Sequence, residues 1–95
     1  MIIIQETYVC KPGNASKVAK LFKEALADFK SVTNIVTDMT GQFNRVIVFS
    51  QYDNLTAYEK SWKDFSEEEM KKMQEKMKGY TEMYQTGGRE IFQVW

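Results

Sequence analysis

The chain begins and ends with segments in which β-branched and aromatic residues predominate. Residues 2–10 (IIIQETYVC) form the first, and the Pro12-Gly13 pair follows it with a turn signal. Residues 89–95 (REIFQVW) form the last, after a Gly87-Gly88 pair that is typical of a final turn. We therefore expect a strand at each end of the chain.

A helical period follows the first strand. Apolar residues recur at three-and-four spacing, and Lys17, Lys20 and Lys23 occupy much of the opposite face. Asn14 stands where a side chain can accept from the amides of the first turn. The pattern predicts an amphipathic helix with one buried stripe, made of Val18, Leu21, Phe22, Ala25, Leu26 and Phe29.

Two further strands are predicted in the middle of the chain. Residues 33–40 (TNIVTDMT) are only half apolar, which favours a place near a sheet edge. Gly41-Gln42 supplies a turn, and residues 43–52 (FNRVIVFSQY) carry apolar side chains on both faces. Such a strand is expected to be covered on both sides, by the chain's own helices on one and by another body on the other.

The second helical region is predicted to consist of two pieces that meet near Phe65. Asp53 or Asn54 can cap the first piece, and Ser66 with Glu69 forms a capping box for the second. The first piece carries an apolar stripe of Leu55, Tyr58, Trp62 and Phe65, and the second carries Met70, Met73, Met77, Tyr80 and Tyr84.

The resulting order, β-α-β-β-α(α)-β, predicts a single domain over residues 1–95. It is the order of a ferredoxin-like α+β fold, in which helices cover one face of a four-stranded antiparallel sheet.

Charge and composition narrow the possible functions. Thirteen basic residues balance 13 acidic ones, so the basic footprint needed for nucleic acid or an anionic membrane is missing. The chain has no histidine and one cysteine, which argues against zinc, heme or any other metal cofactor and fits a reducing cytoplasm. No segment approaches the ~20 apolar residues of a membrane span. An RNA-recognition module shares the element order, but residues 44–52 (NRVIVFSQY) lack its glycine and spaced aromatic residues.

Three features together resemble the dimeric α/β-barrel superfamily, which includes antibiotic-biosynthesis-type monooxygenases and NIPSNAP-like proteins. They are the Pro12-Gly13 turn, the helix from Asn14 that contains Phe22, and residues 46–62 (VIVFSQYDNLTAYEKSW). The resemblance implies a homodimer in which two sheets pack face to face, with a pocket between each sheet and its own helices. Such packing would cover the second apolar face of residues 43–52.

The chain departs from the catalytic patterns of that superfamily. Heme-degrading members resemble one another in an Asn on strand one, where this chain has Glu6, and they need a histidine for iron. Members that act on quinols or signalling molecules often carry a Glu on strand three and a His on the next helix. The matching stretch here offers Ser50 and then Ser61 or Trp62. These departures weaken an oxygenase interpretation.

Glu6 is the candidate catalytic residue. It shares a strand face with Ile4, Tyr8 and Cys10, and a carboxylate among apolar groups can act as a general base. The alternative is a structural ion pair with a lysine or with Arg89.

The candidate ligand-binding residues are Tyr8, Tyr58 and Trp62, whose aromatic faces and polar tips suit a planar ligand. The alternative for all three is ordinary core packing. Cys10 is expected to be a small buried hydrophobe rather than a nucleophile, and the methionines to pack rather than bind a metal.

The sequence thus favours a homodimeric protein with a pocket for a small apolar or aromatic ligand and no cofactor. The alternative is a cofactor-independent monooxygenase or isomerase that uses Glu6 as base.

Overall fold

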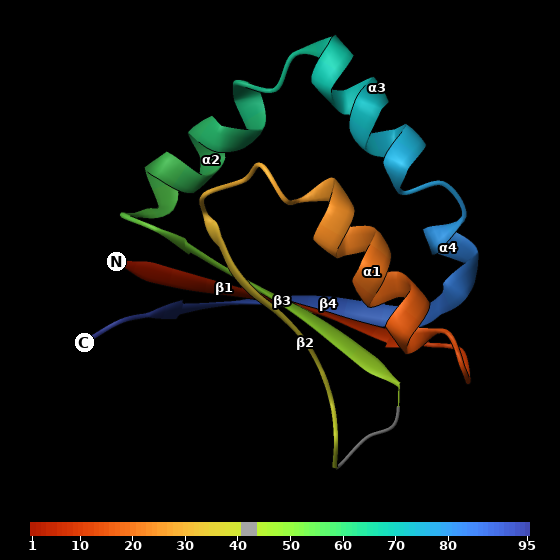
Figure 1. Cartoon of the computed structure of the whole chain (residues 1–95). Helices are drawn as coiled ribbons and strands as arrows, with labels where there is room; N and C mark the ends of the chain where they lie inside the picture. The colour runs from red at the N-terminus through yellow and green to blue at the C-terminus, as the bar shows by residue number, and fades with distance from the viewer. Residues whose placement is uncertain (41–43) are drawn as a thin grey trace.

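Four antiparallel strands form one sheet in a computed structural model that describes residues 1–40 and 44–95. The strands are β1 (Ile2–Cys10), β2 (Val32–Thr37), β3 (Arg45–Tyr52) and β4 (Tyr84–Gln93), in the order β2-β3-β1-β4. The helices lie on one face of this sheet (Figure 1). The α+β, ferredoxin-like prediction is confirmed.

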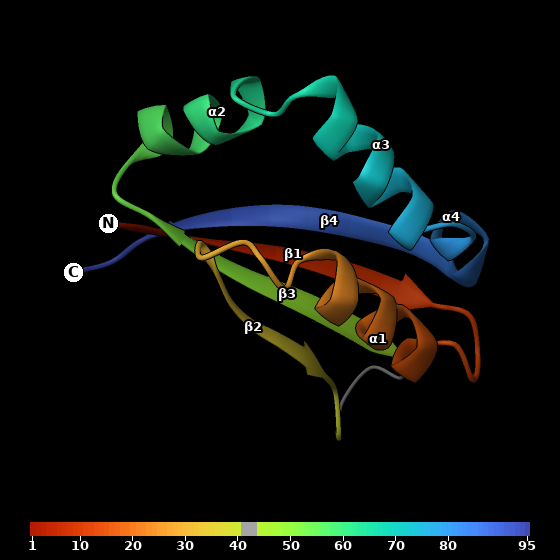
Figure 2. The ribbon, with the colours of Figure 1, turned by 45° about the horizontal axis from the view of Figure 1, so that its top comes forward.

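The helices are α1 (Ala15–Ala25), α2 (Leu55–Lys63), α3 (Glu67–Lys76) and the short α4 (Tyr80–Met83). The predicted break near Phe65 is confirmed, because α2 and α3 are separate helices that arch together over the sheet (Figure 2). None of the helices in the described part of the chain is long and apolar enough to span a membrane.

Each of the two helices beside this break, α2 and α3, begins with a predicted side-chain cap. Asn54 has an extended backbone, and its Oδ1 accepts from the Ala57 amide at 2.8 Å. Ser66 Oγ accepts from the Glu69 amide at 3.2 Å. Both bonds satisfy amides that the first turn of a helix leaves unpaired.

The predicted cap at Asn14 is wrong. Asn14 already has a helical backbone (φ −100°, ψ −9°), and its side chain makes no capping hydrogen bond. A capping side chain needs an extended backbone to reach the following amides. Only the main-chain carbonyl of Asn14 serves the helix, accepting from the Val18 amide at 2.9 Å.

The end of the chain also differs from the prediction. The helical stripe does not run unbroken to Tyr84. Gly79 has a left-handed backbone (φ 87°) and separates α3 from α4, and Tyr84 has an extended backbone that begins β4. The Gly87-Gly88 pair is not a turn, since both glycines lie inside β4 opposite Tyr8 and Thr7. A Cβ on Gly87 would lie 2.7 Å from the carbonyl oxygen of Thr7, so a close approach of β1 explains that glycine.

The two middle strands are shorter than predicted. β2 covers residues 32–37, where residues 33–40 were predicted, and lies at a sheet edge, as expected. β3 begins at Arg45 rather than residue 43. The predicted turn at Gly41-Gln42, together with Phe43, lies outside the described residues.

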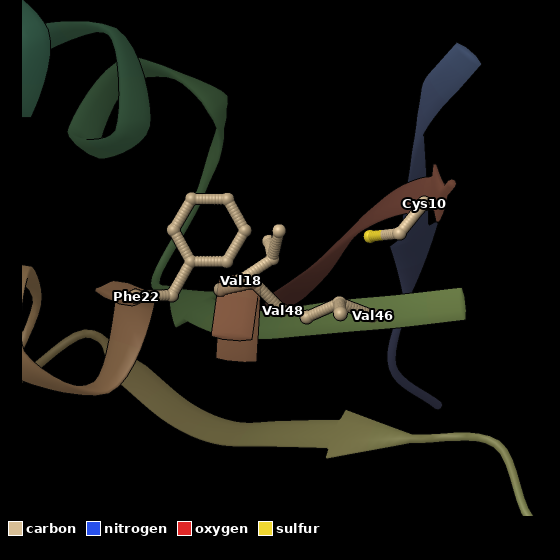
Figure 3. Close-up of a cluster of buried hydrophobic side chains, with 5 residues drawn as sticks. All are labelled: Cys10, Val18, Phe22, Val46 and Val48. Atoms are coloured by element: carbon tan, nitrogen blue, oxygen red, sulfur yellow. The ribbon is translucent and has the colours of Figure 1, made fainter. Parts of the chain in front are cut away.

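The core lies between α1 and the centre of the sheet and consists of Cys10, Val18, Phe22, Val46 and Val48 (Figure 3). Cys10 is buried as predicted, and burial raises the pKa of its thiol, so the reactive thiolate is disfavoured. By contrast, α2 and α3 contain no fully buried residue. The sheet beneath these two helices is therefore less tightly covered than the sheet beneath α1.

None of the helices among the described residues lies on the opposite face of the sheet (Figure 2). The register places Ile3 and Phe92 side by side on that face, with Ile47 and Phe49 on the neighbouring strand. Phe92 is 45% exposed. We call these residues, together with Val9, the open sheet face.

Candidate functional site

A cavity of about 290 Å³ lies between the sheet and the helices α2 and α3. Its described lining contains six aromatic side chains, three methionines and one charged side chain, that of Glu6. The aromatic residues are Phe29, Tyr52, Tyr58, Trp62, Phe65 and Tyr80, and the methionines are Met70, Met73 and Met77. The few remaining polar groups are three serines and Gln74.

The walls are built from aromatic pairs between different elements. Tyr58 and Trp62 stand one turn apart on α2, with ring centroids 6.3 Å apart. Tyr52 at the end of β3 packs on Tyr58 at 5.1 Å. Phe29, just after α1, stacks on Phe65 between α2 and α3 at 5.3 Å. These contacts hold α2 above the sheet while leaving the space between them open.

Glu6 shares a face of β1 with the buried Ile4 and Cys10, as the strand period predicts, and this face lies toward the helices. Its Oε2 accepts from the Tyr8 hydroxyl at 3.2 Å and from an Arg89 guanidinium nitrogen at 3.3 Å. Its Oε1 makes no hydrogen bond within the described residues. The ion pair with Arg89 is therefore present, and Glu6 also lines the cavity with one oxygen unpaired.

Arg89 lies directly opposite Glu6 on β4. Its guanidinium carbon is 5.9 Å from the ring centroid of Tyr58 and 5.8 Å from that of Trp62. Its side chain is 46% exposed and does not line the cavity. Arg89 thus contacts the Glu6 carboxylate and the rings of Tyr58 and Trp62 from outside the cavity. Sequence reasoning named it only as a partner for Glu6, because the aromatic contacts depend on the register of β4.

Tyr8 is not part of the cavity lining, although sequence reasoning grouped it with Tyr58 and Trp62. Its ring packs against Phe22 and Tyr84, with centroids 4.8 and 5.3 Å away. Burial, followed by the negative charge of Glu6, raises the pKa of Tyr8. Tyr8 therefore remains protonated and reaches the site through its hydrogen bond to Glu6.

Tyr58 carries the one buried polar side-chain atom without a partner in the described structure, its hydroxyl oxygen. The neighbouring Ser61 hydroxyl donates instead to the Tyr58 main-chain carbonyl at 2.6 Å. Trp62 is 54% exposed. Helix α2 therefore carries both an unpaired hydroxyl, on Tyr58, and an accessible aromatic surface, on Trp62.

No protein-family model and no curated protein matches the chain. Solved structures do match it. An uncharacterized NIPSNAP domain protein from Burkholderia xenovorans has a TM-score of 0.81 at 11% identity, over 100% of this chain and 95% of that one. A NIPSNAP family protein from Agrobacterium tumefaciens has a TM-score of 0.77 at 15% identity, over 99% and 92%.

A putative antibiotic biosynthesis monooxygenase from Deinococcus radiodurans has a TM-score of 0.64 at 11% identity, over 100% of this chain and 93% of that one. The chain has the fold of these NIPSNAP and monooxygenase structures. The resemblance inferred from the sequence is confirmed at the level of the fold, and function must be argued from the site itself.

Proposed function

We propose that this protein binds a small apolar or aromatic molecule in the cavity between the sheet and α2–α3. The observation that carries the proposal is the cavity itself, which six aromatic side chains line and which has few polar groups. Small-molecule sites are typically lined by hydrophobic and aromatic side chains with a small number of polar groups.

The size and lining of the cavity agree with this function. Its volume of about 290 Å³ is at the lower end of the range for small-molecule sites, about 300–1,000 Å³. The methionines on α3 provide a wall that can adapt to the shape of a ligand. We therefore expect a ligand of one or two rings.

Methionine methyl signals in NMR can test binding of naphthol as a probe. Met70, Met73 and Met77 line the cavity, while Met1 and Met39 are exposed elsewhere. Naphthol should shift the three cavity signals and leave those of Met1 and Met39 unchanged. Trp62→Ala should weaken binding at least about fivefold, because a large aromatic contact is lost. Trp95→Ala is the matched control, since Trp95 is fully exposed.

Shifts spread evenly over all the methionines, or an equal effect of both tryptophan variants, would contradict a specific site in this cavity.

A second function, cofactor-independent proton abstraction by Glu6, is favoured by one observation. The unpaired Oε1 belongs to a residue that lines the cavity, so it can reach a proton of a bound ligand. The test is deuterium exchange at the α-carbon of indanone in heavy water, followed by NMR. Wild type should accelerate exchange and Glu6→Gln should not. A wild-type rate equal to that of buffer would remove the case for this enzyme.

We further propose that the protein is a homodimer whose two subunits cover each other's open sheet face. The apolar side chains on that face and the fold shared with the NIPSNAP structures support this assembly.

A further inference from the structure

The cavity has an unusual charge pattern for an apolar site. Glu6 is its one charged lining residue among the described residues, and no lysine or arginine side chain lines it. We propose that the cavity selects a ligand whose apolar or aromatic body carries an ammonium group, with Glu6 Oε1 accepting its N–H. This inference rests on the proposed function, because it names the ligand class for the same cavity.

Glu6 has one carboxylate oxygen that no protein group uses as an acceptor among the described residues. Both hydrogen bonds to Glu6 reach Oε2, from Tyr8 and from Arg89, so Oε1 is available. A carboxylate oxygen is acceptor-only, and its strongest partners are positively charged N–H groups. A ligand that can donate a charged hydrogen bond is therefore the best match for Oε1.

The aromatic lining of the cavity also favours a cation. A cation is attracted to the face of an aromatic ring within about 6 Å of its centroid. The guanidinium of Arg89 already lies at 5.8–5.9 Å from Tyr58 and Trp62 and at 3.3 Å from Glu6. The same three side chains thus hold a cation outside the cavity, and they also line the cavity, which Arg89 does not.

Arg89 does not satisfy Glu6 completely. It makes one contact of 3.3 Å, longer than the about 2.7–2.9 Å typical of a charge-assisted hydrogen bond, and it is 46% exposed. Water therefore screens part of its charge. An anionic ligand would instead place a second negative charge beside Glu6, with no lining cation to offset it.

The experiment compares three ligands with one aromatic body and different head groups: phenethylamine, phenethyl alcohol and phenylpropionate. At neutral pH these are a cation, a neutral donor and an anion. Titration of the full chain, followed by the methyl signals of Met70, Met73 and Met77, gives each affinity. We expect the amine to bind about tenfold more tightly than the alcohol, and the carboxylate to bind more weakly than both.

Variants separate this preference from general packing. Glu6→Gln should weaken amine binding far more than alcohol binding and bring the two affinities within about twofold of each other. Tyr8→Phe removes a neighbour of Glu6 but keeps its charge, so the preference should persist. Arg89→Gln should strengthen amine binding relative to alcohol, because a competing cation is removed, whereas a merely structural Arg89 would weaken both.

Equal affinities for the three ligands, or tighter binding of the carboxylate, would overturn this inference. If naphthol still binds in the cavity in that case, the proposed function stands. If neither naphthol nor any of the three ligands shifts the cavity methionines, the proposed function fails and this inference fails with it.

Discussion

Glu6 is held by residues on two adjacent strands, Tyr8 two positions along β1 and Arg89 opposite on β4. The alternation of residues along β1 was enough to place Glu6, Ile4 and Tyr8 on one strand face, but it does not show that this face lies toward the helices. The contact of Arg89 with Tyr58 and Trp62 could not be predicted, because the Gly87-Gly88 pair looks like a turn and hides the register of β4.

The Glu6–Arg89 pair should contribute little to stability. Its side chains are 21% and 46% exposed, and a glutamine could still accept from Tyr8 and Arg89. Glu6→Gln should therefore lower the free energy of unfolding by at most about 1 kcal/mol, measured by urea denaturation. The control is Glu59→Gln, which breaks a more exposed pair with Lys63 and should have no measurable effect. A loss beyond about 3 kcal/mol for Glu6→Gln would mean that the pair behaves as a buried one.

Tyr8 should make stability depend on alkaline pH. Its pKa is raised in the folded protein by burial and then by Glu6, so the folded state keeps a proton that the unfolded state loses above about pH 10. Its stabilising contribution is complete below that pH and is lost as pH rises toward the folded pKa. Urea denaturation between about pH 9 and pH 11 should show a smaller decline for Tyr8→Phe than for wild type. Parallel declines would contradict the raised pKa.

At the scale of elements, polar capping residues predicted the helix boundaries better than apolar periodicity did. Ser66 correctly marked the start of α3 inside a long apolar stripe. The apolar stripe itself predicted a helix through Tyr84. Tyr80 and Tyr84 are four residues apart in the sequence, which is a helical spacing, but the same spacing is present when Tyr84 lies in a strand. Gly79 interrupts that run between α3 and α4 with a left-handed backbone, and Tyr84 takes an extended backbone at the start of β4. The periodicity records neither change.

Two asparagines at helix starts provide a matched test of capping. Asn54 accepts a hydrogen bond from the Ala57 amide, whereas the Asn14 side chain makes no such bond. Asn54→Ala should lower the free energy of unfolding by about 1 kcal/mol, and Asn14→Ala should cost less than half of that. Urea denaturation of both variants gives the comparison. An equal loss would show that Asn14 caps α1 in solution.

The two glycines of β4 provide a second matched test. A Cβ at Gly87 would lie 2.7 Å from the Thr7 carbonyl oxygen, a main-chain atom that cannot move without disturbing β1. A Cβ at Gly88 would have no heavy-atom neighbour within 4 Å. Gly87→Ala should destabilise by about 1–3 kcal/mol, as overpacking does, while Gly88→Ala should be neutral or slightly stabilising. Thermal unfolding that ranks them in the reverse order would contradict the β1–β4 register.

At the scale of the whole molecule, the fold leaves one face of the sheet uncovered. The helices of the described residues cover one face of the sheet (Figure 2). The strand register places Ile3, Ile47, Phe49 and Phe92 on the other face. The sequence predicted this from the apolar residues on both faces of residues 43–52. It could not show which contacts close the second face, because these depend on a surface outside the single chain.

We expect a second copy to cover the open sheet face, burying at least about 1,200 Å² in total, the lower limit of a stable interface. Light scattering at micromolar concentration should then give about twice the 11.1 kDa chain mass. Phe49→Lys places a charge in the middle of that face and should shift the mass toward the monomer. Leu55→Lys is the matched control, because Leu55 is an exposed apolar residue on the helix layer, and it should leave the dimer intact. A wild-type monomer, or dissociation by both variants alike, would contradict a dimer formed through this face.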